Sequence, residues 1–214
     1  MLIALTIVVL IFSIIAHEVA HGYAADALGD PTARLAGRLT LNPLPHLDLM
    51  GSILIPALLI FSGSPILFGW AKPVPYNPFN LRGPWGLPAQ AGEFLVAIAG
   101  AATNIVLAII FGLIARWAGG AGLPASAVAL AGTIAFVNLF LGMFNLIPFP
   151  PLDGFTALRS ALPWDISARF VRFEARVRAS GSLALILFLL VFSYVLANPF
   201  FNLVSWTFRL IVGS

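Results

Sequence analysis

The chain of 214 residues has no cysteine and only 9% charged residues, and each shortage excludes a class of protein. Without cysteine, neither a disulfide framework nor a thiolate metal site can form. Soluble domains carry roughly 25% charged residues, so a soluble fold is excluded as well. The chain also lacks the alternating segments of about 10 residues that a membrane β-barrel needs. With 60% hydrophobic residues, it is expected to be an all-α polytopic membrane protein.

Long apolar runs predict about five to six transmembrane helices and a re-entrant or hairpin segment at 49–80. The runs at 2–28, 91–116, 125–147 and 183–212 reach or exceed the roughly 20 residues that span a bilayer. The run at 49–62 is too short to span, and the prolines after it favour extended chain. The last run, about 45 Å long as one helix, is interrupted by Asn198-Pro199 and is expected to be one kinked helix or two short ones.

The chain is expected to form a single domain over 1–214, with a core of about 1–165 and C-terminal membrane helices at 181–214. Between them, residues 165–180 carry Arg169, Arg172 and Arg176 on one side of a helix and apolar residues on the other. That pattern is typical of an amphipathic helix lying at the membrane interface.

The basic residues predict an orientation in the cell membrane. Nine of the eleven Lys and Arg residues lie in segments 30–90 and 152–180. The positive-inside rule places both segments in the cytoplasm, so the first helix runs from outside to inside. No Lys or Arg precedes its apolar run, which argues against a cleaved signal peptide.

The sequence HEVAH stands in the first apolar run and holds His17, Glu18 and His21, two of the three histidines in the chain. A charge at membrane depth costs roughly 2.5–3.5 kcal/mol, so these groups need a local reason. Because His17 and His21 are four residues apart, both lie on one helix face, the spacing with which two imidazoles bind zinc. Glu18 lies about 100° round the helix, where it can take a proton from a zinc-activated water.

A catalytic zinc site needs a third protein ligand, and the candidates are His46, Asp48, Glu93 and Asp153. Asp153 is favoured because it follows the proline-broken helix end NLIPFPPLDG, at a depth that matches HEVAH. A carboxylate at such a place is costly unless it binds something. The alternative is that Asp153 caps the helix that starts near Gly154.

Three motifs, HEVAH, AGAATN and NLIPFPPLDG, together resemble the site-2 protease family of intramembrane zinc metalloproteases. Their order and spacing match from about residue 1 to residue 165. The chain is most similar to the short prokaryotic branch, which lacks a PDZ or CBS domain and carries a GWAKPVPYNP-like stretch. The resemblance implies one Zn²⁺ per chain, ligated by His17, His21 and Asp153, with Glu18 as catalytic base. Ala101 stands where many members have proline.

Further polar residues are candidates for the site. Asn104 is expected to stabilise the oxyanion or hold substrate backbone, the alternative being a bond to a neighbouring helix. Asn145 has the same two alternatives, with carbonyls freed by Pro148 as its other partner. Extended segment 72–78 is expected to pair with substrate as an added strand, which makes Lys72, Val74 and Tyr76 substrate-binding candidates.

The other three candidates for the third ligand have other interpretations. His46 and Asp48 are either a supporting pair or pH-sensitive gate of the site, or simply part of an interfacial loop. Glu93 is expected to be a charge near the N-terminus of its helix.

The expected function is therefore zinc-dependent hydrolysis of peptide bonds in transmembrane segments of membrane proteins, a form of regulated intramembrane proteolysis. Its partners would be membrane-protein substrates and the lipid bilayer, with no nucleic acid; homo-oligomerisation stays open. The alternatives are a membrane zinc transporter and a catalytically inactive membrane scaffold. Glu18 separates them, since hydrolysis needs a base and transport does not.

Overall fold

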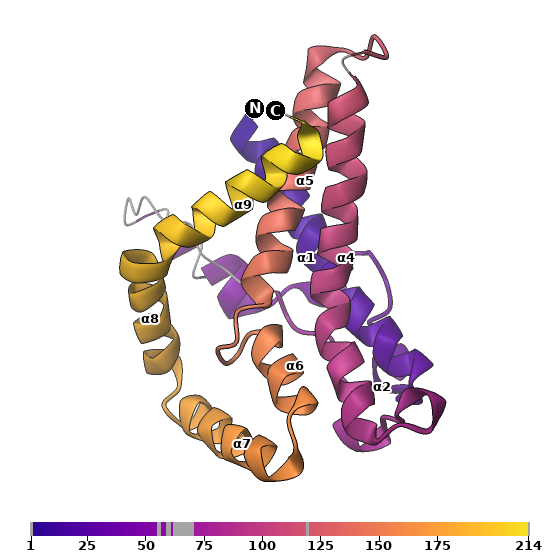
Figure 1. Cartoon of the computed structure of the whole chain (residues 1–214), viewed down its shortest axis with the longest axis vertical. Coiled ribbons are helices and arrows are strands. Elements are labelled where there is room, and N and C mark those ends of the chain that lie inside the picture. The colour runs from indigo at the N-terminus through magenta and orange to yellow at the C-terminus, as the bar shows by residue number, and fades with distance from the viewer. Residues whose placement is uncertain (1, 55–56, 59–60, 62–70, 119, 214) are drawn as a thin grey trace.

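The computed structural model describes residues 2–54, 57–58, 61, 71–118 and 120–213, and these ranges contain helices and connecting segments without a strand (Figure 1). The all-α prediction is confirmed. Among the described residues, four helical stretches are long and apolar enough to cross a membrane: Leu5–Ala27, Ala89–Ala118, Ala125–Asn145 and Ile186–Val212. The expected count of five to six is not reached in this part of the chain.

Three long helices form the body of the molecule: α1 (Leu2–Ala27), α4 (Ala89–Ala118) and α5 (Ala125–Asn145). They run side by side in Figure 1, and α4 contacts both of the others. The face of α4 toward them repeats every four residues and is mostly small: Gly92, Val96, Gly100, Asn104, Ala108 and Gly112 are all buried. Small residues let membrane helices approach closely, and α4 runs through Ala101 without a break.

Short helices connect and flank this body. After α1 come α2 (Thr32–Leu35), the 3₁₀ turn η1 (Leu44–His46) and the π-helical turn η2 (Leu49–Leu54). The 3₁₀ turns η3 (Pro78–Asn80) and η4 (Pro84–Gly86) precede α4. Part of the expected re-entrant segment at 49–80, namely 55–56, 59–60 and 62–70, lies outside the described ranges, whereas 71–77 is extended and non-helical as its prolines predict.

Beyond α5 the chain forms α6 (Asp153–Ala161) and α7 (Trp164–Ala179). Helix α7 corresponds to the expected amphipathic helix. It packs on α6 through Phe170 and Phe173, which contact Phe155, and its three stacked arginines are exposed.

The last apolar run forms two helices joined by a short turn, which was one of the two alternatives expected from the sequence. It consists of α8 (Ser182–Val191), the π-helical turn η5 (Phe192–Leu196) and α9 (Ala197–Val212), and the chain changes direction between α8 and α9 (Figure 1). The turn precedes Pro199, because a proline lacks the N–H that would bond the carbonyl four residues earlier and its ring clashes with that carbonyl. Phe188 and Phe192 hold α8 and η5 against Phe144 of α5.

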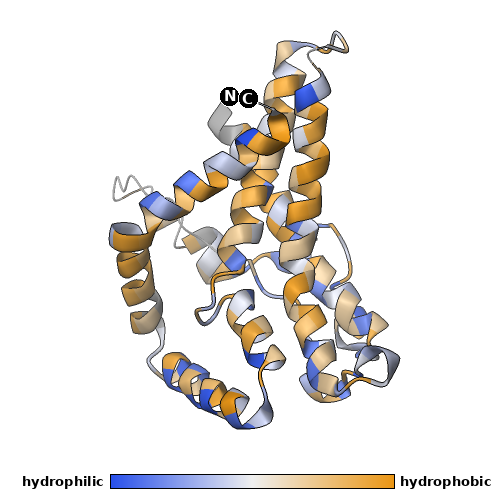
Figure 2. Ribbon diagram, viewed as in Figure 1, coloured by the Kyte–Doolittle hydropathy of each residue, from blue (hydrophilic) through white to orange (hydrophobic). Residues whose placement is uncertain are grey.

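The long helices consist mostly of hydrophobic residues (Figure 2). In the apolar windows of α1, α4 and α5, only 28–33% of residues are buried. Large side chains such as Val8, Ile110 and Leu187 are at least 47% exposed. Soluble monomers rarely expose so continuous an apolar surface, so this surface is one that lipid covers. The protein is a multi-pass membrane protein.

Asp30 joins the end of α1 to the segment that precedes α4. Its side chain is fully buried, and its carboxylate accepts hydrogen bonds from the Asn77 N–H, the Asn80 amide and the Thr32 hydroxyl. Burial acts to raise the pKa of Asp30, but these hydrogen bonds outweigh it and bring the pKa below its ordinary value. The ionised carboxylate therefore fixes the position of segment 77–80.

Replacing Asp30 with Asn should lower stability at neutral pH, because a hydrogen bond to a charged group contributes about 1.5–3 kcal/mol. Since the folded-state pKa lies below the ordinary value of about 3.9, the contribution is complete above that pH and disappears as the pH falls through the folded-state pKa. Thermal unfolding in detergent should show a lower Tm for Asp30→Asn at pH 7 and a smaller difference below about pH 4. Asp165→Asn, at an exposed carboxylate, is the control; equal effects of the two changes would contradict the assignment.

Candidate metal centre

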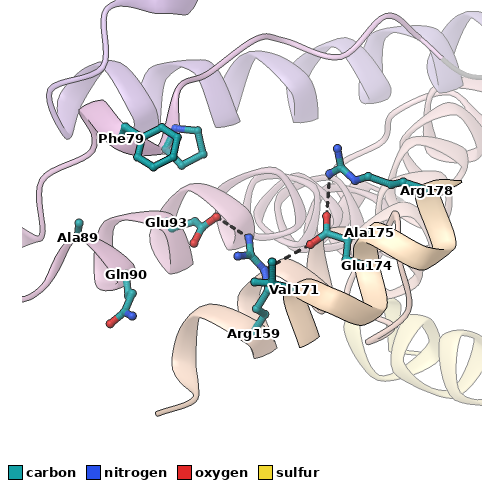
Figure 3. Close-up of a pocket in the computed structure, with 10 residues that line it drawn as sticks. Phe79, Ala89, Gln90, Glu93, Arg159, Val171, Glu174, Ala175 and Arg178 are labelled. Carbon is teal, nitrogen blue, oxygen red and sulfur yellow. Dashed lines mark hydrogen bonds and ion pairs between the residues drawn. The ribbon is translucent and has the colours of Figure 1, made fainter. Parts of the chain in front are cut away.

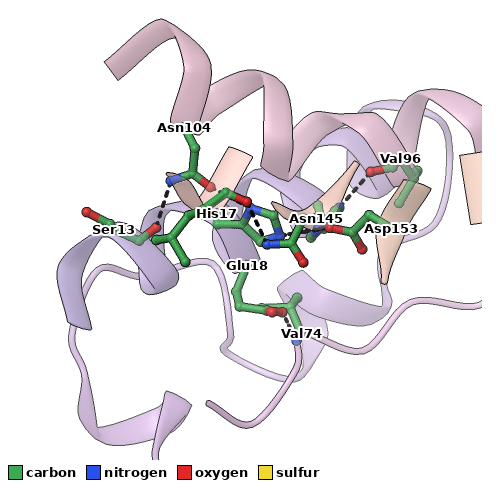
Figure 4. A network of polar contacts seen from close by, with 10 residues as sticks. Ser13, His17, Glu18, Val74, Val96, Asn104, Asn145 and Asp153 are labelled. Carbon is green, nitrogen blue, oxygen red and sulfur yellow. Dashed lines mark hydrogen bonds and ion pairs between the residues drawn. The ribbon is translucent and has the colours of Figure 1, made fainter. Parts of the chain in front are cut away.

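Three side chains far apart in the sequence converge at one point. His17 and His21 come from α1, and Asp153 is the first residue of α6 (Figure 4). The His17 Nε2 lies 2.9 Å from the Asp153 Oδ2 and 3.1 Å from the His21 Nε2. The His21 Nε2 is 3.3 Å from the same carboxylate oxygen. The third ligand favoured from the sequence is thus the candidate that the fold brings to the histidine pair.

Hydrogen bonds on the far side of each ring determine where its proton is. The His21 Nδ1 lies 2.6 Å from the Val96 carbonyl, and the His17 Nδ1 lies 2.6 Å from the Asn104 side-chain oxygen. Both partners accept hydrogen bonds, so each Nδ1 carries a proton and each neutral ring presents a lone pair at Nε2. When both rings are neutral, two lone pairs and a carboxylate face one another, an arrangement that needs a positive charge at its centre, supplied by a metal ion or by protons taken up at Nε2.

The spacing of the three donor atoms suits zinc. Tetrahedral ligands with bonds of about 2.0–2.1 Å lie about 3.3 Å from one another, close to the 2.9–3.3 Å found here. Two imidazoles and one carboxylate also form a known catalytic zinc donor set, which leaves one position for water. Oriented Nδ1–H groups are the usual support of zinc-bound histidines.

Two glycines make the convergence possible. A Cβ at Gly100 would lie 2.5 Å from the His21 Nε2 and 2.6 Å from the His17 ring, so a side chain there would displace both imidazoles. A Cβ at Gly154 would lie 2.2 Å from the Leu146 carbonyl oxygen, so α6 could not approach the end of α5. Gly100 was not among the site residues predicted from the sequence, although it stands in the AGAATN motif.

Helix α6 is held by charge at its other end. Arg159 and Ser160 both bond the Glu93 carboxylate of α4, and the Arg159 Nε lies 3.5 Å from Glu174 of α7. Glu93, Arg159 and Glu174 line a cavity of about 480 Å³ (Figure 3). Glu93, once a candidate ligand, instead anchors the helix that presents Asp153.

Glu18 faces the extended segment 71–77. Its carboxylate accepts a hydrogen bond of 2.9 Å from the Val74 N–H (Figure 4). Arg38, which is buried, holds that segment through the Lys72 and Pro73 carbonyls. The side chain of Val74 is buried, and that of Lys72 is exposed. Burial, together with the Glu93 charge, raises the pKa of Tyr76 to about 12, so its hydroxyl stays protonated.

The two asparagines have different positions. Asn104 is fully buried behind His17, and its nitrogen donates to the Ser13 carbonyl and to Asn138. With its oxygen on His17, it has no group left for an oxyanion, so the expected direct role is replaced by support of His17. Asn145 is partly exposed, lies beside the metal ligands in Figure 4, and donates to the Leu141 carbonyl of its own helix.

The remaining candidates have structural partners. His46 is buried, its Nε2 lies 2.9 Å from the Thr40 carbonyl, and its own carbonyl accepts the Lys72 N–H. Asp48 accepts the Gly51 N–H. His46 therefore holds the start of segment 71–77, and Asp48 bonds within its own turn. The capping alternative for Asp153 is not observed, because Leu152 occupies the N-cap position of α6 without a side-chain cap.

A histidine pair, a carboxylate and an adjacent glutamate inside a membrane helix bundle define a membrane-embedded zinc hydrolase. Comparison with known proteins agrees: the model of peptidase family M50 matches residues 118–192. "Putative zinc metalloprotease YwhC" of Bacillus subtilis (strain 168) is 38% identical over 201 residues, covering 89% of this chain and 83% of that protein. The chain belongs to the M50 peptidases, the site-2 protease family, and is a zinc metalloprotease.

Two further relatives carry the same description. Rip2 of Mycolicibacterium smegmatis is 31% identical over 202 residues, covering 92% of this chain and 70% of that protein. Rip3 of Mycobacterium tuberculosis is 33% identical over 181 residues, covering 84% of this chain and 36% of that protein. Among solved structures, none matches the chain significantly.

Zinc binding should depend on Asp153 and not on Asp48. Asp153→Ala removes one of three donors and should lower the zinc content of purified protein from about one per chain to well below it, because a catalytic site needs three protein ligands. Asp48→Ala is the matched control and should keep its zinc. Elemental analysis of both variants tests this; an unchanged zinc content in Asp153→Ala would rule out Asp153 as a ligand.

Proposed function

We propose that this zinc metalloprotease hydrolyses peptide bonds within transmembrane segments of other membrane proteins, with His17, His21 and Asp153 as zinc ligands and Glu18 as general base. The observation that carries the proposal is the position of the donors. Both histidines lie within the apolar stretch Leu5–Ala27, and both are at least 92% buried. A protease site built into a membrane helix meets its substrates in the bilayer.

The residues divide the work of hydrolysis. Zinc, when bound, supplies the Lewis acid that activates water and polarises the scissile carbonyl. Glu18 takes a proton from the attacking water as the C–O bond forms, and returns it to the leaving amine as the C–N bond breaks. Glu18 must first turn from the Val74 N–H. Its place next to His17 in the sequence keeps it beside the site after that rotation.

Asn145 is the candidate for oxyanion stabilisation. One of its amide protons bonds the Leu141 carbonyl, and the amide group has a second proton to donate. The side chain is partly exposed beside Asp153 (Figure 4). A donor aimed at developing negative charge contributes about 2.7–4 kcal/mol to catalysis.

The metal centre lies toward the cytoplasmic side of the cell membrane in this proposal, with the N-terminus outside. The end of α1 that carries His17 and His21 continues into the loops of Arg34, Arg38, Lys72 and Arg82. The positive-inside rule places these loops in the cytoplasm. Water then reaches the metal centre by a short path.

Glu18→Gln should abolish cleavage while zinc stays bound, because the change removes the base and no ligand. The measurement is processing of a single-span reporter in cells, together with zinc analysis of the purified variant. Retained cleavage in Glu18→Gln would refute the role of Glu18 as base. A zinc transporter or an inactive scaffold would instead show no cleavage in either the wild type or the variant. Asp165→Asn, at an exposed carboxylate of α7, is the control and should keep activity.

Substrate is expected to bind as an extended chain along segment 71–77. A helix hides its carbonyls in internal hydrogen bonds and must unwind before attack, and an extended partner stabilises the unwound form. The Val74 side chain faces the interior, and the Val74 N–H already bonds Glu18. A substrate carbonyl that took over this N–H would release Glu18 at the same time.

Because the chain has no cysteine, this contact can be mapped by single-cysteine cross-linking. In the Glu18→Gln background, Lys72→Cys should form a disulfide with a reporter that carries one cysteine near its scissile bond. Arg172→Cys, on the exposed face of α7, is the matched control and should not. Equal cross-linking at both positions would contradict binding along 71–77.

A further inference from the structure

A chain of buried polar side chains runs from α5 to the metal centre. The Asn138 side-chain oxygen accepts a hydrogen bond of 2.8 Å from the Asn104 nitrogen, and the Asn104 oxygen lies 2.6 Å from the His17 Nδ1. Asn138 is 1% exposed and Asn104 is 0% exposed. Neither Asn138 nor its partner Ser13 was a site candidate from the sequence, and buried amides in an apolar bundle are costly unless every group is paired.

The direction of this chain is determined at its far end. The Asn138 nitrogen lies 2.9 Å from the Ile134 carbonyl of its own helix and 2.9 Å from the Ser13 hydroxyl. A backbone carbonyl only accepts hydrogen bonds, so the nitrogen of Asn138 must face Ile134. Its oxygen must then face Asn104.

The same reasoning passes to the next residue. Because Asn104 meets the oxygen of Asn138 and, at 3.2 Å, the Ser13 carbonyl, its nitrogen must lie on that side. Its oxygen is left facing His17 and can only accept. His17 therefore carries its proton on Nδ1, and its Nε2 is free to bind metal.

We infer that Asn138 is a positioning residue, which fixes the tautomer and orientation of the metal ligand His17 through Asn104. The inference rests on the proposed role of His17 and extends it. A purely structural role for Asn138, as a link between α1, α4 and α5, would affect stability but leave the proton position of His17 unchanged.

The test compares Asn138→Leu with Asn138→Asp. Leucine fills the space but accepts no hydrogen bond, so Asn104 is held only by the longer contact to the Ser13 carbonyl. Aspartic acid, protonated because it is buried, can donate to the Ile134 carbonyl and still accept from Asn104. Thr133→Val is the matched control, since the Thr133 hydroxyl donates to the Ala129 carbonyl of its own helix, α5.

Two measurements on the purified full-length protein decide the outcome. Competition with a chelator should show zinc affinity reduced about tenfold in Asn138→Leu, the lower end of the usual 10–100-fold effect of such supporting groups, and restored in Asn138→Asp. In zinc-stripped protein with ¹⁵N-labelled histidine, at a pH above which the imidazole signals no longer change, His17 should be protonated at Nδ1 in wild type and a mixture of tautomers in Asn138→Leu. The three histidines of the chain make these signals assignable.

Wild-type zinc affinity and a wild-type His17 tautomer in Asn138→Leu would overturn the inference. So would a lower Tm as the only change, because that is the result of a structural link. If His17→Ala itself kept full zinc binding and cleavage, the proposed metal centre would fail instead, which distinguishes the two failures.

Discussion

The structure depends on bringing three electron-pair donors to one point inside an apolar bundle. The two Nε2 atoms and the Asp153 oxygen lie 2.9–3.3 Å apart, and the hydrogen bonds at the two Nδ1 atoms leave the Nε2 lone pairs of the neutral rings facing that oxygen. Such an arrangement is unfavourable without a positive charge and strongly favourable with one. The close approach of α4 at Gly100, the approach of α6 at Gly154 and the ion pairs at Arg159 all serve this convergence.

Much of this could be predicted from the sequence because its signals are local. Helical periodicity placed His17 and His21 on one face, and composition gave the membrane helices. Asp153 could be chosen because a carboxylate after a proline-broken helix end needs a partner. The extent of α4 and α5 followed from the glycines and prolines that close them.

The rest depends on which helix faces which, and a single sequence does not contain that information. Asn104 was expected to face substrate, whereas it lies behind His17 with every polar group paired. Asn138 gave no signal, because one amide in an apolar run reads as ordinary helix contact. The break in the last apolar run was expected at Asn198-Pro199 but lies at 192–196. A proline has no N–H to bond the carbonyl four residues earlier, so the helix is disturbed one turn before the proline. The four-residue repeat of small residues on α4 was visible, but its partners were not.

The bond between Glu18 and the Val74 N–H has a consequence for the idle enzyme. In the proposed mechanism, a base that stays occupied until a substrate binds would protect the other helices of the bilayer from cleavage. Here Glu18 is occupied by the backbone N–H of Val74. A substrate in extended form would have free carbonyls that can compete for this N–H. Intact membrane helices, whose carbonyls accept hydrogen bonds within the helix, would not compete for it and would not be cleaved.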